Sequence, residues 1–184
     1  MSLILGYANK DNAIILSDGR AGENGSYSEH FNKTMKINNN IIMGFAGYVE
    51  SLEIFINHLI QEMGDDRENY YIDDFLELID FLMDDKETQE KLRSAFLIIG
   101  RNRNGDMFTC IAGDVSNYKV EKHLVENVRI SSIGGTIEGK IINEIFSKNI
   151  KNKAIPIQDC MINTIKEVAT LDNSVNTNIF GQMI

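Results

Sequence analysis

An apolar run, Leu3-Ile4-Leu5-Gly6-Tyr7-Ala8, begins almost at the N-terminus of this 184-residue chain. The chain turns at residues 9–12 and returns as Ala13-Ile14-Ile15-Leu16, which ends in the polar sequence Ser17-Asp18-Gly19-Arg20. Two short β-leaning runs around a polar Asp-Asn turn predict a hairpin. Chain termini are usually loose, so a strand that starts at residue 3 ties down an end that most domains leave free. We therefore ask whether the terminus itself belongs to a functional site.

Length and composition predict one globular domain over residues 1–184. Hydrophobic residues make up 43% of the chain and charged residues 24%, which are ordinary globular values. The formal net charge of −9 opposes contact with phosphate backbones and anionic lipid, so we expect no nucleic-acid partner and no membrane partner. No apolar run approaches the roughly 20 residues of a membrane span.

The cysteines and histidines give no sign of a metal or redox site. Cys110 and Cys160 lie far apart without CxxC spacing, so buried thiols are the simplest interpretation, with a disulfide or a nucleophile as alternatives. Nothing demands an oxidising compartment, which favours the cytoplasm. His30, His58 and His123 lack metal-ligand spacing, and we expect neither a metal nor an organic cofactor.

The first half of the chain predicts a second hairpin and two helices. The hairpin turns at Asn38-Asn39-Asn40, because asparagine tolerates left-handed backbone. The first helix runs from about Val49 to Met63, and the second carries its apolar stripe over residues 72–83. In both helices the apolar residues recur at the helical period.

The second half predicts two strands, at residues 95–100 and 107–112, joined by a turn that contains Asn104-Gly105. Residues 118–120 and 128–131 are expected to continue that sheet. Gly134-Gly135-Thr136 then leads into a helix that carries Ile137, Ile141, Ile145 and Phe146. Pro156 is expected as the first residue of a last helix, which runs to about Thr170. A closing strand follows near the C-terminus.

Runs of strands that alternate with pairs of helices predict an α+β fold. Two antiparallel sheets stacked face to face, with a helix pair on each outer face, would bury every apolar stripe. The sequence therefore predicts a four-layer αββα sandwich.

The order of these motifs resembles the proteasome β-type family of N-terminal nucleophile hydrolases, including the simpler bacterial peptidase rings. The motifs are the N-terminal hairpin ending in Ser-Asp-Gly-Arg-Ala, then Lys33-x-x-x-Ile37, and then Met43-Gly44-Phe45-Ala46-Gly47 before a helix. Family members open with Thr-Thr-x-x-Gly and continue with D-x-R, a lysine before a strand, and an A-G that closes the next strand. The resemblance extends over nearly the whole chain, to Gly134-Gly135-Thr136 and the segment that begins at Asp172.

The resemblance implies a set of catalytic residues. Gly6 matches the early family glycine, which places Ser2 at the nucleophile's position, where the free α-amino group serves as base. Asp18 matches the family's acidic residue and Lys33 its lysine, with Lys36 as the alternative lysine. Gly47 matches the glycine whose N–H helps to stabilise the oxyanion. The match of Asp172 to the family's late aspartate has a loop-capping role as its alternative, and Arg20 matches an arginine with a structural salt bridge.

Three features depart from the family pattern. Serine replaces the usual threonine at position 2, Gly134 replaces a serine, and Val175 occupies another serine position, with Ser174 one residue away. No pro-segment precedes Ser2 in the sequence, so activation is expected to require only removal of Met1. Alternatively, Met-Ser-Leu is a vector remnant and Ser2 is not native.

The predicted function is hydrolysis of peptide bonds in peptides or unfolded proteins, inside a homo-oligomeric ring. One alternative is a catalytically silent scaffold of the same fold, which Gly134 and Val175 favour. Another is an amide hydrolase for small molecules.

Overall fold

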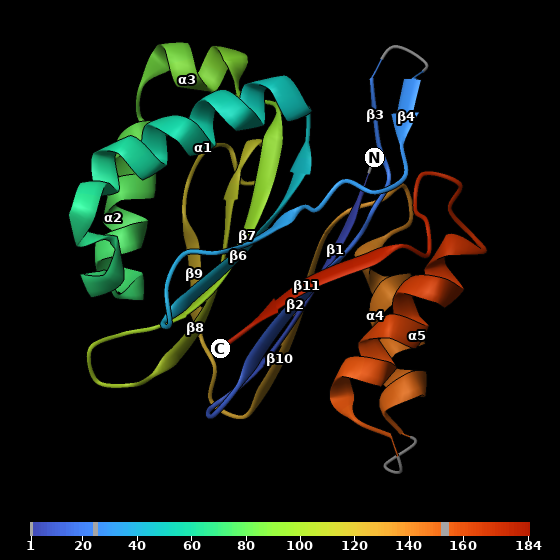
Figure 1. The fold of residues 1–184 in the computed structure, drawn as a ribbon. Helices are drawn as coiled ribbons and strands as arrows, with labels where there is room; N and C mark the ends of the chain where they lie inside the picture. The colour runs from blue at the N-terminus through green and yellow to red at the C-terminus, as the bar shows by residue number, and fades with distance from the viewer. Residues whose placement is uncertain (1, 24–25, 152–154) are drawn as a thin grey trace.

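Two antiparallel sheets lie face to face, and helices cover the outer face of each (Figure 1). This computed structural model describes residues 2–23, 26–151 and 155–184. The predicted α+β sandwich is confirmed. Met1, whose removal the sequence makes part of activation, lies outside the described residues.

The N-terminal hairpin forms the middle of a four-stranded sheet with the order β10-β1-β2-β11. Its strands are β10 (Val128–Gly134), β1 (Leu3–Asn9), β2 (Ala13–Asp18) and β11 (Ile179–Met183). Because β1 lies between β10 and β2, both of its edges are hydrogen-bonded from Leu3 onward, and Ile4 pairs with Ser17. The predicted hairpin is thus confirmed, and the structure adds that its first strand is a central one.

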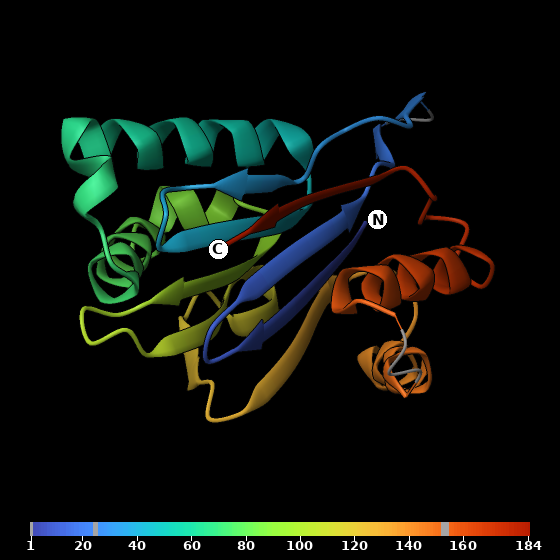
Figure 2. The same cartoon turned by 60° about the horizontal axis from the view of Figure 1, so that its bottom comes forward.

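The second sheet has five strands in the order β5-β6-β7-β8-β9. These are β5 (Thr34–Lys36), β6 (Ile41–Gly47), β7 (Ser94–Arg101), β8 (Met107–Gly113) and β9 (Glu121–Leu124). A separate ribbon of β3 (Ala21–Glu23) and β4 (Ser26–Ser28) follows β2. Figure 2 shows that β11 lies beside β5, so the two sheets approach each other along this edge.

Helices α1 (Val49–Met63) and α2 (Ile72–Met83) cover the five-stranded sheet, and α4 (Gly139–Ile150) and α5 (Ile157–Ala169) cover the four-stranded one. The apolar stripes of α1 and α2 are buried as the periodicity predicts. A short helix, α3 (Lys86–Lys91), follows α2 after Asp84 and Asp85, and short 3-10 helices lie at Gly64–Asn69 and Asp114–Ser116. No helix in the described ranges is both long and apolar enough to cross a bilayer.

Three apolar layers result from this stacking. Phe75 and Phe96 belong to the layer between α1–α2 and the five-stranded sheet. Ile4 and Leu97 belong to the layer between the sheets, and Leu3 and Phe146 to the layer under α4–α5. Adjacent residues of β1 thus enter different layers, as the alternation of side chains along a strand requires.

Several predictions about the second half are wrong in detail. Residues 118–120 form no strand, and the strand that continues the five-stranded sheet is β9. The strand at residues 128–131 belongs instead to the other sheet, where β10 pairs with β1. Helix α4 begins after Ile137 and buries Ile142, whereas Ile141 is exposed.

Pro156 is the residue before the first turn of α5 rather than its first residue.

Candidate active site

Ser2 lies at the N-terminal end of the central strand β1, and only 6% of its surface is exposed. Its Oγ donates a hydrogen bond to the carbonyl of Arg20 at 3.2 Å. Its own carbonyl accepts a hydrogen bond from the Gly135 N–H at 2.8 Å. The segments after β2 and after β10 therefore hold Ser2 from both sides.

Asp18 ends β2 next to Ser2 and is fully buried. Its Oδ1 accepts the Leu3 N–H at 2.8 Å and the Lys33 ammonium at 2.9 Å. Its Oδ2 accepts the Arg20 N–H at 2.9 Å. The carboxylate thus ties the first residue of β1 to a buried cation.

Lys33 approaches Asp18 from the segment before β5, and its side chain is 4% exposed. Its Nζ also donates to the Asp18 carbonyl at 3.0 Å. Burial lowers the pKa of Lys33 below its ordinary value, whereas the charge of Asp18 and its hydrogen bond act in the opposite direction. Lys36, the alternative lysine, is exposed on β5, so Lys33 is the lysine beside the acid.

The turn after β10 supports Ser2 from the opposite side. Gly134 has a φ of +77°, and a Cβ built on it would lie 1.8 Å from the Ser2 carbonyl oxygen. A side chain here would therefore collide with the backbone of Ser2, so this turn requires a glycine.

Asp172 caps this same turn. Its Oδ2 accepts the Thr136 N–H at 2.6 Å, and its Oδ1 accepts the Ser174 hydroxyl at 2.6 Å. Burial raises the pKa of Asp172, but the hydrogen bonds from Ser174 and Thr136 outweigh burial and hold the pKa at about 2. Asp172 thus connects to Ser2 through the turn that carries Gly135.

Gly47 ends β6, on the other sheet, and is exposed. Its φ is +144°, and a Cβ built on it would lie 2.3 Å from the Arg93 carbonyl oxygen. The neighbouring Ala46 has its Cβ 3.0 Å from the Cβ position built on Gly134. The end of β6 therefore lies next to the turn that supports Ser2.

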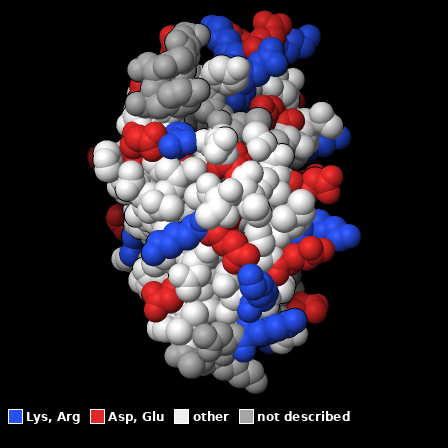
Figure 3. Space-filling model, turned by 90° about the vertical axis from the view of Figure 1, so that its right-hand side faces the viewer, with Lys and Arg blue, Asp and Glu red and all other residues white. Residues whose placement is uncertain are grey.

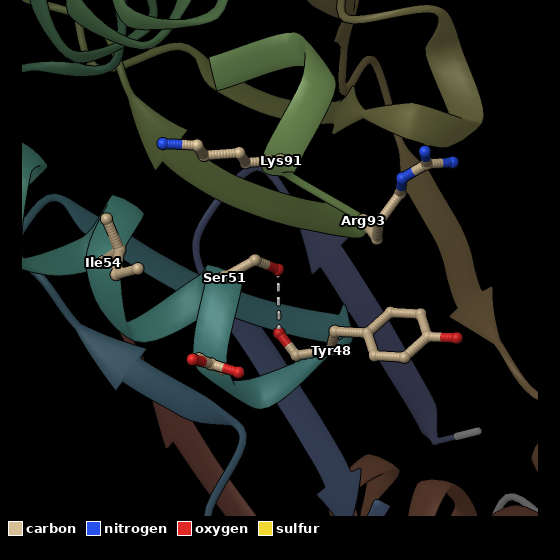
Figure 4. A pocket seen from close by; sticks show the side chains of 6 residues that line it. Tyr48, Ser51, Ile54, Lys91 and Arg93 are labelled. Carbon is tan, nitrogen blue, oxygen red and sulfur yellow. Dashed lines mark hydrogen bonds between the residues drawn. The ribbon is translucent and has the colours of Figure 1, made fainter. Parts of the chain in front are cut away.

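A groove of about 460 Å³ begins directly after Gly47 (Figure 4). It lies between the first turns of α1 and the segment after α3, with Ser51 donating to the Tyr48 carbonyl at 3.1 Å. Its lining combines apolar and charged side chains: Tyr48, Glu50, Ser51, Ile54, Lys91 and Arg93.

The structure also brings in residues that the sequence patterns do not identify. Asn176 contacts Asp18 through its backbone N–H, and its side chain contacts Gly19 and Glu29. Glu29 forms the salt bridge with Arg20 at 3.0 Å. The sequence gives no signal for Asn176, because the residues that it contacts on the β2 side of the site lie 147 to 158 residues away.

The supporting hydroxyl near Asp172 comes from Ser174, since Val175 is buried in the apolar layer under α4–α5. Cys110 and Cys160 are free and buried, and burial raises the pKa of Cys110 to about 12. Within the described ranges, no three His, Cys, Asp or Glu side chains gather in a way that could hold a metal ion.

Taken together, hydrogen bonds join Asp18 to Lys33 and to the backbone of Leu3 and Arg20, and the Arg20 carbonyl accepts the Ser2 hydroxyl. A serine hydroxyl next to a free α-amino group can act as a nucleophile, because the amine accepts the hydroxyl proton. A backbone N–H at the end of β6 is suited to stabilise developing negative charge.

Comparison with known proteins places this geometry in context. Residues 2–99 match the family model "Proteasome subunit". Two of the most similar solved structures are eukaryotic HslV from Trypanosoma brucei and the ancestral β-subunit Anbu from Yersinia bercovieri. Both have a TM-score of 0.73, with 14% and 11% sequence identity.

The alignment covers 98% of this chain and 98% of the HslV chain; for Yersinia Anbu the two values are 98% and 80%. The Anbu complex from Pseudomonas aeruginosa has a TM-score of 0.71 at 14% identity, over 99% of this chain and 80% of that one. No curated protein sequence matches the chain significantly. At these identities the solved structures establish the fold, and the family model, which matches more than half of the chain, establishes the family: the chain belongs to the proteasome subunit family.

Proposed function

We propose that this chain is an N-terminal nucleophile peptidase of the proteasome type, with Ser2 as its nucleophile. The observation that carries the proposal is the cluster at the start of β1, where Asp18 Oδ1 receives both the Leu3 N–H and the Lys33 ammonium. A buried charged pair is costly unless its geometry is well satisfied. Its position beside the first serine of the chain favours a chemical role for it.

The reaction begins once whatever precedes Ser2 has been removed, which frees the α-amino group. An α-amine has a pKa near 8, so at neutral pH part of it is unprotonated and accepts the Ser2 hydroxyl proton. Oγ then attacks the carbonyl carbon of the scissile bond, and the carbonyl oxygen takes up the negative charge. The N–H of Gly47 stabilises this oxyanion.

The second half releases the products. The α-ammonium group donates its proton to the departing amine, the C–N bond breaks, and the acyl group remains on Oγ as an ester. Water then gives a proton to the α-amine and attacks the ester carbon. The bond between that carbon and Oγ breaks, the α-ammonium group returns the proton to Oγ, and the carboxylic acid leaves. Lys33 keeps a positive charge close to the amine, which favours its neutral form, and Asp18 holds Lys33 in place.

The substrate of this proposal is an extended peptide or an unfolded protein that lies along the groove after Gly47. The groove's mixed lining of apolar and charged side chains supports a chain-like substrate. A small-molecule amide hydrolase is the alternative, and a panel of peptide and small amide reporters distinguishes the two.

The proposal includes a homo-oligomer that encloses the sites as a ring. The Pseudomonas aeruginosa Anbu complex is described as a helical assembly, which supports self-association of this fold. Residues 49–93, which span α1 to α3, hold 14 of the chain's 27 acidic residues and 4 of its 18 basic ones. Two such layers would repel each other.

The face of α4 and α5 instead carries interspersed positive and negative side chains (Figure 3). We therefore expect copies to stack through that face and not through two α1–α3 layers. Light scattering of the protein with and without charge reversals at Lys140 and Lys148 tests this arrangement, because both lysines lie on α4.

The competing candidate is a catalytically silent subunit of the same fold. Gly134 and Val175, which lack the family's hydroxyls, favour it. The deciding experiment is the cleavage of peptide reporters by the natural, untagged protein and by Ser2→Ala. Loss of turnover in Ser2→Ala supports the nucleophile, and equal turnover of the two proteins would rule it out.

A further inference from the structure

The carboxylate of Asp18 is hydrogen-bonded by four N–H groups. Oδ1 accepts from Leu3 and Lys33, and Oδ2 accepts from Arg20 at 2.9 Å and from the backbone of Asn176 at 3.4 Å. Two carboxylate oxygens offer about four lone pairs, so the acceptor capacity of Asp18 is fully used. Three of the four donors are backbone groups from three different segments, which fixes the orientation of the carboxylate.

The Asn176 side chain joins two of these segments. Its Oδ1 accepts the Gly19 N–H at 2.8 Å, directly after Asp18, and the Asn178 N–H at 3.2 Å. Its Nδ2 donates to the Glu29 carbonyl at 3.0 Å and to Glu29 Oε2 at 2.5 Å. The residue is 8% exposed, and its amide makes all four of the hydrogen bonds open to it.

Only one orientation of this amide satisfies its surroundings. The two backbone N–H groups require an acceptor, and the two Glu29 oxygens require a donor. A reversed amide would place oxygen against oxygen and leave buried donors unpaired, which is costly. The Asn176 amide is therefore a directional link between the end of β2 and residue 29.

Arg20 anchors the Glu29 end of this link. Its Nε donates to Glu29 Oε1 at 3.0 Å and its Nη2 to Oε2 at 3.3 Å. Hydrogen bonds from Asn176 and then from Arg20 lower the pKa of Glu29, so Glu29 stays ionised as an acceptor. Arg20 also supplies the carbonyl that accepts the Ser2 hydroxyl. Asn176 and Glu29 therefore hold residues 18–20, the segment whose Arg20 carbonyl accepts the Ser2 hydroxyl.

We propose that Asn176 is a positioning residue for the Ser2 nucleophile, which it holds in place through Asp18 and the backbone of residues 18–20. This inference rests on the proposed function, and it assigns a second purpose to the loop between α5 and β11. Asp172 caps the turn after β10, whereas Asn176 fixes the end of β2. One loop therefore sets both sides of Ser2.

The test compares Asn176→Ala with Asn178→Ala. Asn178 is a matched control, because its Nδ2 also donates to the Glu29 carbonyl, at 2.8 Å, but its side chain makes no hydrogen bond to Asp18 or Gly19. We expect Asn176→Ala to lower kcat about tenfold, because the Gly19 N–H directly after Asp18 loses its acceptor, with KM changed less than about twofold. Asn178→Ala should leave both constants close to those of the unchanged protein.

The pH profile separates positioning from general destabilisation. If Lys33 moves away from the terminus, the α-amine is more easily protonated, so the acidic limb of kcat should move to higher pH in Asn176→Ala. A folded variant with lower stability alone would keep the limb where it is. An unshifted limb together with unchanged kcat overturns the proposal.

A second test combines two substitutions, so that the proposal can still be tested if Asn176→Ala does not fold. In Asn176→Asp the new carboxylate faces Glu29, and the repulsion should lower kcat more than Asn176→Ala does. Adding Glu29→Gln supplies an amide donor to the new carboxylate, and kcat should return to within about threefold of the unchanged protein. Failure of this rescue in a folded double variant contradicts the directional link.

The closing measurement needs no activity: the side-chain ammonium resonance of Lys33, followed by NMR in the unchanged protein, Asn176→Ala and Asn178→Ala. We expect it to shift in Asn176→Ala only. If the unchanged protein cleaves no peptide and the resonance still shifts, the proposed function fails while the link to Asp18 and Lys33 stands. An unshifted resonance in folded Asn176→Ala overturns the link itself.

Discussion

The two sides of Ser2 hold it by different means. On the side of β2, a buried ion pair and directional hydrogen bonds fix Asp18, Lys33 and the start of β1. On the side of β10, the turn at Gly134 holds the Ser2 carbonyl by close backbone contact and has no room for a side chain. The first side should therefore be sensitive to charge and the second to volume.

The largest effect should come from breaking the charged side. Asp18→Asn leaves the Lys33 ammonium buried without its counter-ion, which should lower the free energy of unfolding by about 3–5 kcal/mol. Urea denaturation measures the change. Asp11→Asn, in the exposed turn of the same hairpin, serves as the control and should stay within about 0.5 kcal/mol. Equal losses in the two variants would contradict the role of the ion pair.

The volume-sensitive side is tested by Gly134→Ala. Its Cβ would meet the Ser2 carbonyl, so we expect peptidase activity to be lost and the free energy of unfolding to fall by more than about 2 kcal/mol. Gly105→Ala is a matched control, because Gly105 has a similar φ of +87° but nothing within 4 Å of its built Cβ. The free energy of unfolding of Gly105→Ala should therefore fall by only about 1 kcal/mol, the cost of placing alanine in this backbone conformation. The variant should keep its activity.

A smaller effect should come from Asp172, which supports the β10 side through hydrogen bonds. Its pKa is lowered from 3.8 to about 2, so it stabilises the folded state above pH 3.8, and this contribution disappears as the pH falls toward 2. The contribution is about 2 kcal/mol at most. Asp172→Asn should remove this part of the acid transition in thermal unfolding scans.

Asp114→Asn, an exposed aspartate in the turn after β8, should leave the acid transition unchanged. An identical acid transition in the unchanged protein and in Asp172→Asn would contradict the capping role.

The sequence predicts best what local patterns determine. The hairpin β1–β2 and helix α1 follow from alternation and helical period, and their bounds agree closely with the structure. Helix α3 has no buried residue, so it leaves no apolar period to detect. The pairing of β10 with β1 could not be predicted from local patterns either, because packing across the whole chain decides which strands are neighbours.

The site divides in the same way. Ser2, Asp18 and Lys33 are recognisable through the family resemblance, and the structure brings them together. Their catalytic roles, like those of Gly47 and Asp172, stay predictions, as does a single domain over residues 1–184. Asn176 was not recognisable, because its significance depends on contacts with segments about 150 residues away. That Ser174 supplies the hydroxyl beside Asp172, although position 175 carries a valine, likewise depends on a turn geometry that spacing alone does not give.

The most direct test of the account is the chemical state of Ser2 in the natural, untagged protein. Intact-mass measurement should show that Ser2 is the first residue. A peptidyl epoxyketone, which captures a hydroxyl and an α-amine on one residue, should then add one equivalent per chain, and Ser2→Ala should abolish the addition. A retained residue before Ser2, or equal labelling of Ser2→Ala, would contradict the assignment of Ser2 as an N-terminal nucleophile.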